Sequence, residues 1–244
     1  MPNLPDSLFL DPVWAALQTS HRSLALTAGD ACRYPADVAP FAALAEPTSK
    51  ALGDLATLLA PADPVWIFGL GQSLGQSLGQ GLGEADPAAV GLTLKATLDC
   101  LQMVLPDHID PPEPGPGILP LTCAAAPEMV ALTDIAFPGF FRPRTCAMGS
   151  YFGIRREGEL IAMGGERLVF PGYSEMSGLC THPSHRGNSY ATSLLWHLAR
   201  RHRRAGIVSW LHVGASNQRA VDLYLYLGFE IVRKLPIFQL ARAA

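Results

Sequence analysis

The residues with the types and spacing to do chemistry lie first in a short loop at 186–191, RGNSYA. The loop follows a strand predicted at 173–181 and precedes a predicted helix, in which Ala191, Leu194 and Leu198 recur at helical spacing. The first N–H groups of a helix lack partners within it, and the helix dipole is positive there. The loop therefore predicts a site for a phosphate or pyrophosphate group that needs no lysine.

A second set of residues, Cys180, His182 and His212, has the types of a nucleophile and its base. Such a pair would form an acyl-enzyme. The sequence indicates no Asn or Asp to orient the histidine, and a cysteine on a strand is usually a small apolar residue. His212 lies in the apolar run WLHV at 210–213, so we interpret it as a hydrogen-bonded core histidine.

The anion-binding loop is followed by a strand at 211–213, Asn217, a helix carrying Tyr224, and Gly228-Phe229. In this order the two motifs resemble those of the GCN5-related N-acetyltransferase (GNAT) superfamily, most closely its FR47-like branch. The resemblance covers roughly residue 119 to the C-terminus. Ser189 stands where the superfamily usually has glycine, and its Cβ would weaken binding if the backbone needs a positive φ.

The resemblance implies a fold and a co-substrate. We expect an α/β (α+β) GNAT fold: a mixed, mostly antiparallel sheet with flanking helices, plus an N-terminal lobe that resembles a degenerate copy of the second half. The activity implied is transfer of an acetyl group from acetyl-CoA to a primary amine. The residues implied to bind acetyl-CoA are Leu179, Cys180, Thr181, Arg186, Gly187, Asn188, Ser189, Tyr190, Ala191 and Asn217.

The resemblance also implies a base and an acid. Glu175 lies eleven positions before Arg186, the spacing of the catalytic glutamate in histone acetyltransferases of the superfamily. Glu175 could equally be a solvent-facing carboxylate or one paired with Arg156 or Arg167. Tyr224 precedes Gly228-Phe229 as the superfamily's acid does, the alternative being that it fills the core.

The loop at 138–144, PGFFRPR, is where the resemblance places the acceptor. Phe141, Arg142 and Arg144 are the candidate contacts, because arginine binds carboxylates bidentately. We expect a small acceptor with a carboxylate beside its amine, such as an amino acid or a peptide-like metabolite, rather than a polyamine. The alternative is that both arginines cover apolar surface or pair with neighbouring acids.

The helices and strands predicted around these residues divide the chain into two parts joined by a linker. Residues 1–110 predict an N-terminal α/β lobe with helices at 11–27 and 48–59, a strand at 64–68 and one or two strands at 88–105. A Gly-Gln-Leu repeat at 69–83 indicates a surface loop. Residues 111–117 form a Pro/Gly-rich linker. Residues 118–244 form the GNAT domain, with a strand at 118–122, a helix at 127–137 and hairpin turns at 157–158 and 171–172.

The composition of the chain argues against several classes of protein. A net charge of −3 leaves no basic surface for nucleic acid, so we interpret the arginines at 200–204 as a favourable helix end. No apolar run is long enough for a membrane helix, and no export signal is visible, which favours a cytoplasmic protein acting on a small-molecule amine, as a monomer or homodimer. Five cysteines without a C-x-x-C pair argue against disulfides, and no metal site is expected. The alternative function is a non-catalytic acyl-CoA-binding or interaction protein that retains the fold.

Overall fold

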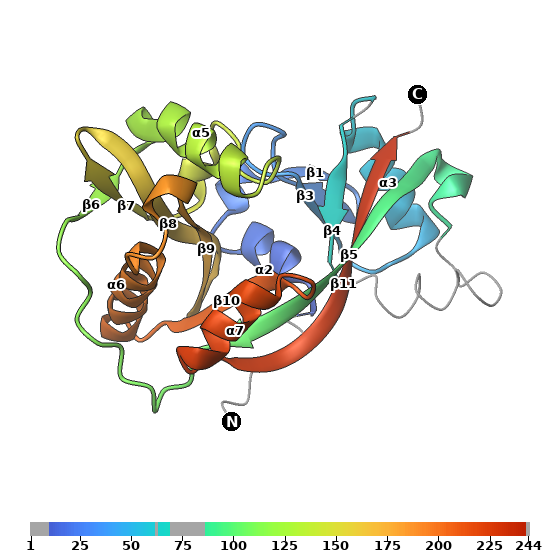
Figure 1. Cartoon of the computed structure of the whole chain (residues 1–244). Helices are drawn as coiled ribbons and strands as arrows, with labels where there is room; N and C mark the ends of the chain where they lie inside the picture. Colours follow the sequence, from blue (N-terminus) through green and yellow to red (C-terminus); the bar gives the residue numbers. More distant parts are fainter. Residues whose placement is uncertain (1–9, 62, 69–85, 243–244) are drawn as a thin grey trace.

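The computed structural model describes residues 10–61, 63–68 and 86–242, whose strands form one sheet of eleven in the order β1-β2-β3-β4-β11-β5-β10-β9-β8-β7-β6 (Figure 1). The strands are β1 (Leu26–Ala28), β2 (Ala31–Arg33), β3 (Phe41–Leu44), β4 (Val65–Ile67), β5 (Leu92–Val104), β6 (Ile118–Leu121), β7 (Tyr151–Arg156), β8 (Glu159–Phe170), β9 (Tyr173–Thr181), β10 (Val208–Gly214) and β11 (Glu230–Arg242). The helices are α2 (Pro12–Gln18), α3 (Ser49–Leu58), α5 (Ala126–Ala136), α6 (Tyr190–Arg204) and α7 (Gln218–Tyr226). This is the predicted mixed, mostly antiparallel GNAT fold.

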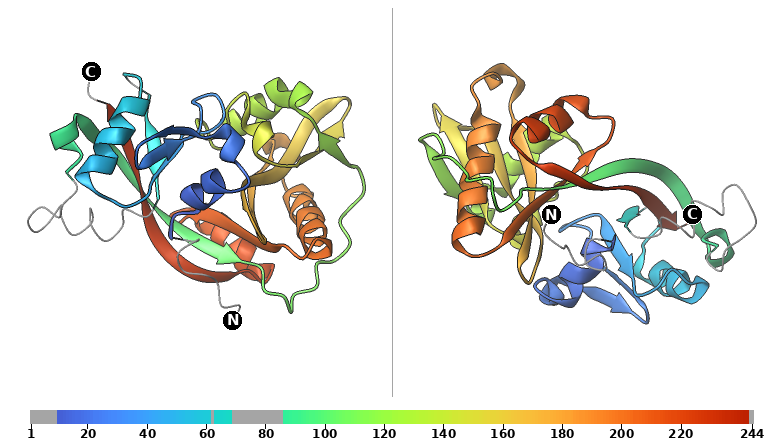
Figure 2. Two further views of the ribbon diagram at one scale, coloured as in Figure 1. Left: turned by 180° about the vertical axis from the view of Figure 1, so that it is seen from behind. Right: turned by 90° about the horizontal axis from the view of Figure 1, so that it is seen from below.

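Strands β5 and β11 pair antiparallel along their whole length and connect the two ends of the sheet (Figure 2). On its other edge β5 pairs with β10, so this strand from the first 110 residues lies inside the sheet of the C-terminal part. The division of the chain at 111–117 and the degenerate-copy origin of the first lobe stay predictions. The pairing of β5 shows only that the two parts share one sheet.

Helix caps, turn glycines and apolar spacing explain where several helices and hairpins form. Asp11 accepts the N–H of Trp14, and Pro12 occupies the first turn of α2, but the helix ends at Gln18 rather than at residue 27. Thr48 caps α3 in the same way, through the N–H of Ala51. The hairpin turns at 157–158 and 171–172 are present, with glycine at positive φ in each. Buried Leu194, Leu195 and Leu198 form the face of α6 that packs on β8 and β9.

The N-terminal lobe shares a core with the C-terminal part, in which Phe41 and Phe68 lie in the same buried cluster as Trp210. The loop before β7 is tied to the lobe by polar contacts as well: the Thr145 hydroxyl donates to the Val38 carbonyl, and the His21 ring contacts the Met148 carbonyl. The lobe thereby holds the loop that the sequence places at the acceptor.

Three further observations bear on the sequence predictions. Cys123 and Cys146 form a disulfide, so the expectation of five thiols is wrong for these two; Cys32, Cys100 and Cys180 are buried thiols. The pairing could not be predicted, because helix α5 and an irregular loop lie between the two cysteines and their spacing matches no recognisable motif. The repeat at 69–83 lies outside the described residues. Among the described helices, none has both the length and the apolar character to cross a membrane.

Candidate active site

The site begins where the parallel strands β9 and β10 separate. Their pairing runs from Val208 opposite Tyr173 to Trp210 opposite Glu175 and then ends. Beyond that point the two strands line a pocket of about 260 Å³, with Met176 to Leu179 on one side and His212 to Gly214 on the other. We call it the aromatic pocket, because Phe41, Phe68, Phe137 and Phe140 complete its wall.

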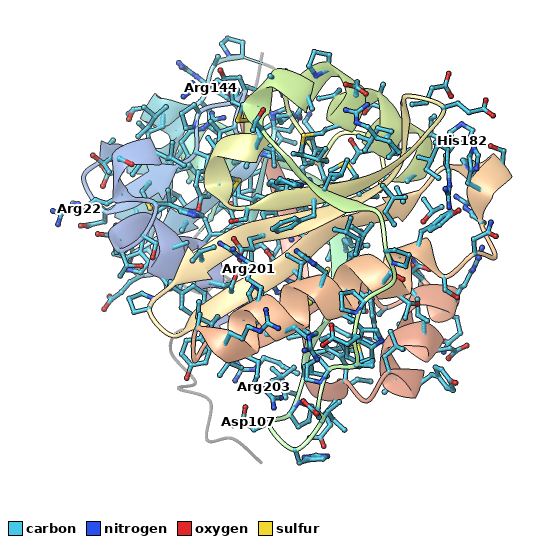
Figure 3. All side chains as sticks on the ribbon, turned by 90° about the vertical axis from the view of Figure 1, so that its left-hand side faces the viewer. Arg22, Asp107, Arg144, His182, Arg201 and Arg203 are labelled. Atoms are coloured by element: carbon cyan, nitrogen blue, oxygen red, sulfur yellow. A yellow bond between two sulfur atoms is a disulfide. The ribbon has the colours of Figure 1, made fainter. Side chains whose placement is uncertain are left out.

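A second hollow, of about 800 Å³, runs from the end of β9 across the start of α6 to α7. We call it the long groove. All ten residues predicted to bind acetyl-CoA line it: Leu179, Cys180, Thr181, Arg186, Gly187, Asn188, Ser189, Tyr190, Ala191 and Asn217. Figure 3 shows the end of the molecule where α6 begins, near His182, and the opposite end of that helix, which carries Arg201 and Arg203. The sequence motifs thus meet in one hollow.

The loop that opens α6 has the backbone of an anion cradle. Gly187 has φ 85° and nothing within 4 Å of the position where a Cβ would stand. Ser189, the N-cap of α6, has φ 57° and makes no side-chain capping bond. Left-handed residues turn successive N–H groups toward one side, and the open space at Gly187 allows close approach of a ligand. The loop therefore fits a pyrophosphate, and Ser189 has the positive φ that was considered as a condition for weaker binding.

Strand β9 carries a bulge beside the pocket. Cys180 is opposite Met163 and Ser177 is opposite Gly165, so two residues of β9, Gly178 and Leu179, face a single residue of β8. Gly178 has φ 67°, which a side chain would strain. A bulge leaves one residue without a ladder partner. The backbone here offers an N–H that can polarise a carbonyl at the pocket's edge.

Glu175 lies behind the aromatic pocket and has no exposed surface. Arg167 donates to it through Nε at 2.8 Å and Nη2 at 2.6 Å. The Nδ1 of His212 lies 2.8 Å from its Oε1, and the Leu168 N–H 3.3 Å from its Oε2. Burial alone would raise the pKa of Glu175, but the charge and hydrogen bonds of Arg167, helped by His212, lower it to about 2. So weak a base, sealed from both hollows, does not suit the predicted role, and the pairing with Arg167 is the alternative left open by the sequence.

His212 lines the aromatic pocket directly. Burial lowers its pKa below 6.5 despite the nearby carboxylate, so the ring is neutral near pH 7. Because the ionised Glu175 can only accept, Nδ1 carries the proton and Nε2 has the free lone pair. The amide nitrogen of Gln102 lies 3.1 Å from Nε2. His212 is therefore a base with a defined tautomer. With 5% of its side chain exposed and a partner at each ring nitrogen, it is also the hydrogen-bonded core histidine that the sequence predicted.

Tyr224 lines both hollows, on the face of α7 that meets the end of β9. Burial raises the pKa of its hydroxyl to about 12, which keeps the hydroxyl protonated at neutral pH. Asn217 caps α7, accepting the N–H of Ala220, and also lines both hollows. Tyr226 is 87% exposed at the rim of the groove. The junction of the two hollows thus has a proton donor on one side and a neutral histidine on the other.

This geometry has counterparts among known proteins. The acetyltransferase (GNAT) family profile matches residues 125–229. A solved structure, described as an acetyltransferase of the GNAT family from Novosphingobium aromaticivorans, is 31% identical over 97% of this chain and 99% of that one, with a TM-score of 0.79. The chain belongs to the GNAT family of acetyltransferases.

Two more distant structures share the fold. A GCN5-related N-acetyltransferase from Kribbella flavida is 22% identical over 95% of this chain and 94% of its own, with a TM-score of 0.61. An N-acetyltransferase-like protein from Streptococcus suis is 10% identical over 98% and 94%, also with a TM-score of 0.61. No curated protein matches the chain. Membership of the GNAT family implies the use of an acyl-CoA, which the long groove fits.

In this GNAT enzyme the predicted acceptor residues Phe141, Arg142 and Arg144 line neither hollow. Phe141 is buried edge-on against Tyr151, and the exposed Arg144 pairs with Asp37. The main chain of Arg142 is held by the Thr145 hydroxyl. Side-chain directions in an irregular loop do not alternate, so the sequence could not show which residues of the loop point inward.

The C-cap of α5, Phe137, and one residue of the loop, Phe140, instead line the aromatic pocket of the GNAT enzyme. Phe41 and Phe68 come from the N-terminal lobe, where no sequence signal pointed to the site. The one signal for His212 was its place as a polar residue in the apolar run 210–213. Within the described residues, no group of three or more His, Cys, Asp or Glu is arranged to hold a metal ion.

Proposed function

We propose that this GNAT enzyme transfers an acetyl group from acetyl-CoA to the primary amine of a small molecule. The observation that carries the proposal is that the long groove and the aromatic pocket meet at Leu179, Asn217 and Tyr224. An acyl donor in the groove and an amine in the pocket would approach each other there. Placement within the FR47-like branch, a cytoplasmic location, and a monomer or homodimer are proposals supported by the sequence alone.

The main chain of the protein would make most of the contacts with the acyl-CoA donor. The loop at 186–191 lines the groove at the positive end of the α6 dipole, and its N–H groups would hold the pyrophosphate. Leu179, Cys180 and Thr181 lie on β9 beyond the end of its pairing with β10, and this edge of the strand would bind the pantetheine arm. The donor supplies the activated acetyl thioester, and the bulge at Gly178 and Leu179 would bind its carbonyl oxygen.

His212 would act as the base and Tyr224 as the acid in proton transfer. Once the Gln102 amide turns away from it, the Nε2 of His212 would take the proton from the acceptor's ammonium, directly or through one water. The amide of Gln102 can assist, because it offers an N–H to the neutral ring and, after a half-turn, an oxygen to the protonated ring. Glu175 would act as a positioning residue that fixes the tautomer of His212. Tyr224 holds a proton where the departing thiolate needs one.

The test uses the purified chain. Acetyl-CoA should raise its melting temperature, and a panel of amines assayed by thiol release should include a substrate. The variant His212→Asn keeps an N–H donor for Glu175, so acetyl-CoA should still stabilise the protein while kcat falls at least 100-fold. The control His197→Asn changes a half-buried histidine outside both hollows and should retain full activity.

Two outcomes would contradict the proposal. Stabilisation by acetyl-CoA without turnover of any amine would favour the non-catalytic acyl-CoA-binding protein. An unchanged pH–rate profile in His212→Asn would remove this residue from the reaction and leave the proton to a water-linked group.

A further inference from the structure

The wall of the aromatic pocket restricts what the acceptor can be. Its four phenylalanines come from three separate segments. Phe140 stacks on Trp66 at 5.7 Å between centroids, and Phe41 contacts Phe68 at a tilt at 5.8 Å. Leu98, Met176, Val213 and Ile237 extend the apolar surface. The volume of about 260 Å³ is below the roughly 300–1,000 Å³ of common ligand pockets. A small acceptor with an apolar or aromatic body fits.

The charge in the pocket excludes another class of acceptor. No Asp or Glu is among the described residues that line it, since Glu175 lies behind Arg167 and His212. The Arg167–Glu175 pair is neutral as a unit, and His212 is neutral near pH 7. A second ammonium on the acceptor would therefore enter an apolar space without a counter-charge, which is costly. In an acceptor with a carboxylate beside its amine, the two charges lie next to each other and offset part of this cost.

Arg167 provides one donor beyond its ion pair. Its contacts with Glu175 use Nε and Nη2, while its guanidinium lies 4.8 Å from the Phe41 ring centroid and forms part of the pocket wall. Among the described residues, Nη1 has no hydrogen-bond partner. It is available to an oxygen of a molecule bound in the pocket. A carboxylate is the oxygen acceptor that a guanidinium binds best.

We propose that the acceptor is an aromatic or large apolar α-amino acid: its side chain lies among the phenylalanines, its carboxylate accepts from Arg167 Nη1, and its amine faces His212. The inference rests on the proposed acetyl transfer and specifies its acceptor. It replaces Arg142 and Arg144 by Arg167 as the carboxylate contact. As a zwitterion the amino acid enters with no net charge.

The experiment compares L-phenylalanine, phenylalaninamide, phenethylamine, L-alanine and spermidine at saturating acetyl-CoA, with kcat/KM measured by thiol release. L-phenylalanine should exceed each of the other four at least 10-fold. Spermidine as the best acceptor, or phenylalaninamide used as well as phenylalanine, would overturn the inference and leave acetyl transfer intact. Absence of turnover with every amine would overturn the proposed function itself.

Two variants test the residues. Arg167→Lys keeps a cation for Glu175, but its single nitrogen leaves no second one for the acceptor's carboxylate, so the preference for phenylalanine over phenethylamine should fall about 10-fold. That ratio is measured within one variant, and a purely structural loss would lower both activities equally and overturn the assignment. The matched control Arg144→Ala should leave the ratio unchanged.

The second variant, Phe140→Ala, removes a half-buried wall residue. The KM for phenylalanine should rise about 10-fold while that for alanine stays the same. The control Ile135→Ala, at an exposed residue of α5 outside the pocket, should change neither KM. An unchanged phenylalanine KM in Phe140→Ala would place the acceptor's side chain elsewhere.

Discussion

Replacing Ser189 by glycine should stabilise the protein without loss of acetyl-CoA binding. Ser189 is exposed, has φ 57° and ψ 21°, and its hydroxyl makes no capping bond with α6. The left-handed conformation costs a residue with a Cβ about 1–2 kcal/mol. Glycine avoids that cost but loses about 0.4–1 kcal/mol more to chain entropy on folding. The expected net gain is about 0.5–1 kcal/mol, or about 1–4 °C in melting temperature for a chain of this size.

The structure supplies a matched control. Glu157 has φ 51° and is the other non-glycine residue with positive φ in the described chain. It lies in the β7–β8 turn, outside both hollows. Glu157→Gly should therefore raise the melting temperature by a similar amount, and it should leave the dissociation constant of acetyl-CoA unchanged.

The affinity for acetyl-CoA, measured by calorimetric titration, completes the test. Ser189→Gly retains the backbone N–H and should bind acetyl-CoA as tightly as the wild type or more tightly. Ser189→Pro removes that N–H and cannot adopt a positive φ, so affinity should fall. Equal affinity in the proline variant, or weaker binding in the glycine variant, would refute the backbone cradle.

Three further predictions concern other parts of the chain. Tyr224→Phe should lower kcat at least 10-fold while the dissociation constant of acetyl-CoA stays the same; a fall in affinity alone would contradict the acid role. The pKa of Glu175, lowered from 4.5 to about 2, stabilises the folded state above pH 4.5 by about 3 kcal/mol, and this is lost as the pH falls toward 2. Glu175→Gln should therefore be less stable at pH 7 and lose less stability on acidification in urea titrations at pH 3, 5 and 7; parallel curves would refute the linkage. Breaking the disulfide by Cys123→Ser, across a separation of 23 residues, should cost about 3 kcal/mol, and reduced wild type should melt at the same temperature as this variant.

The sequence alone determined the local elements and the set of residues that line the long groove. Hydrophobic spacing predicts α6, turn residues predict the two hairpins, and the order of the motifs at 186–191 and 217–229 indicates acyl-CoA binding. The helix, each hairpin turn and each motif can be recognised in the sequence because each depends on residues a few positions apart. The sequence marked Ser189 as a position where the superfamily usually has glycine, which is a local property, and the structure shows its positive φ.

Tertiary structure alone decided the acceptor side and the proton chemistry. Phe41 and Phe68 reach the pocket because β5 inserts between β10 and β11 and brings the N-terminal lobe against the splayed strands. Glu175 is a buried partner of Arg167 and His212 because three strands converge there. Such contacts depend on which apolar faces meet across the sheet. That choice is made by packing over the whole molecule, and no spacing along the chain encodes it.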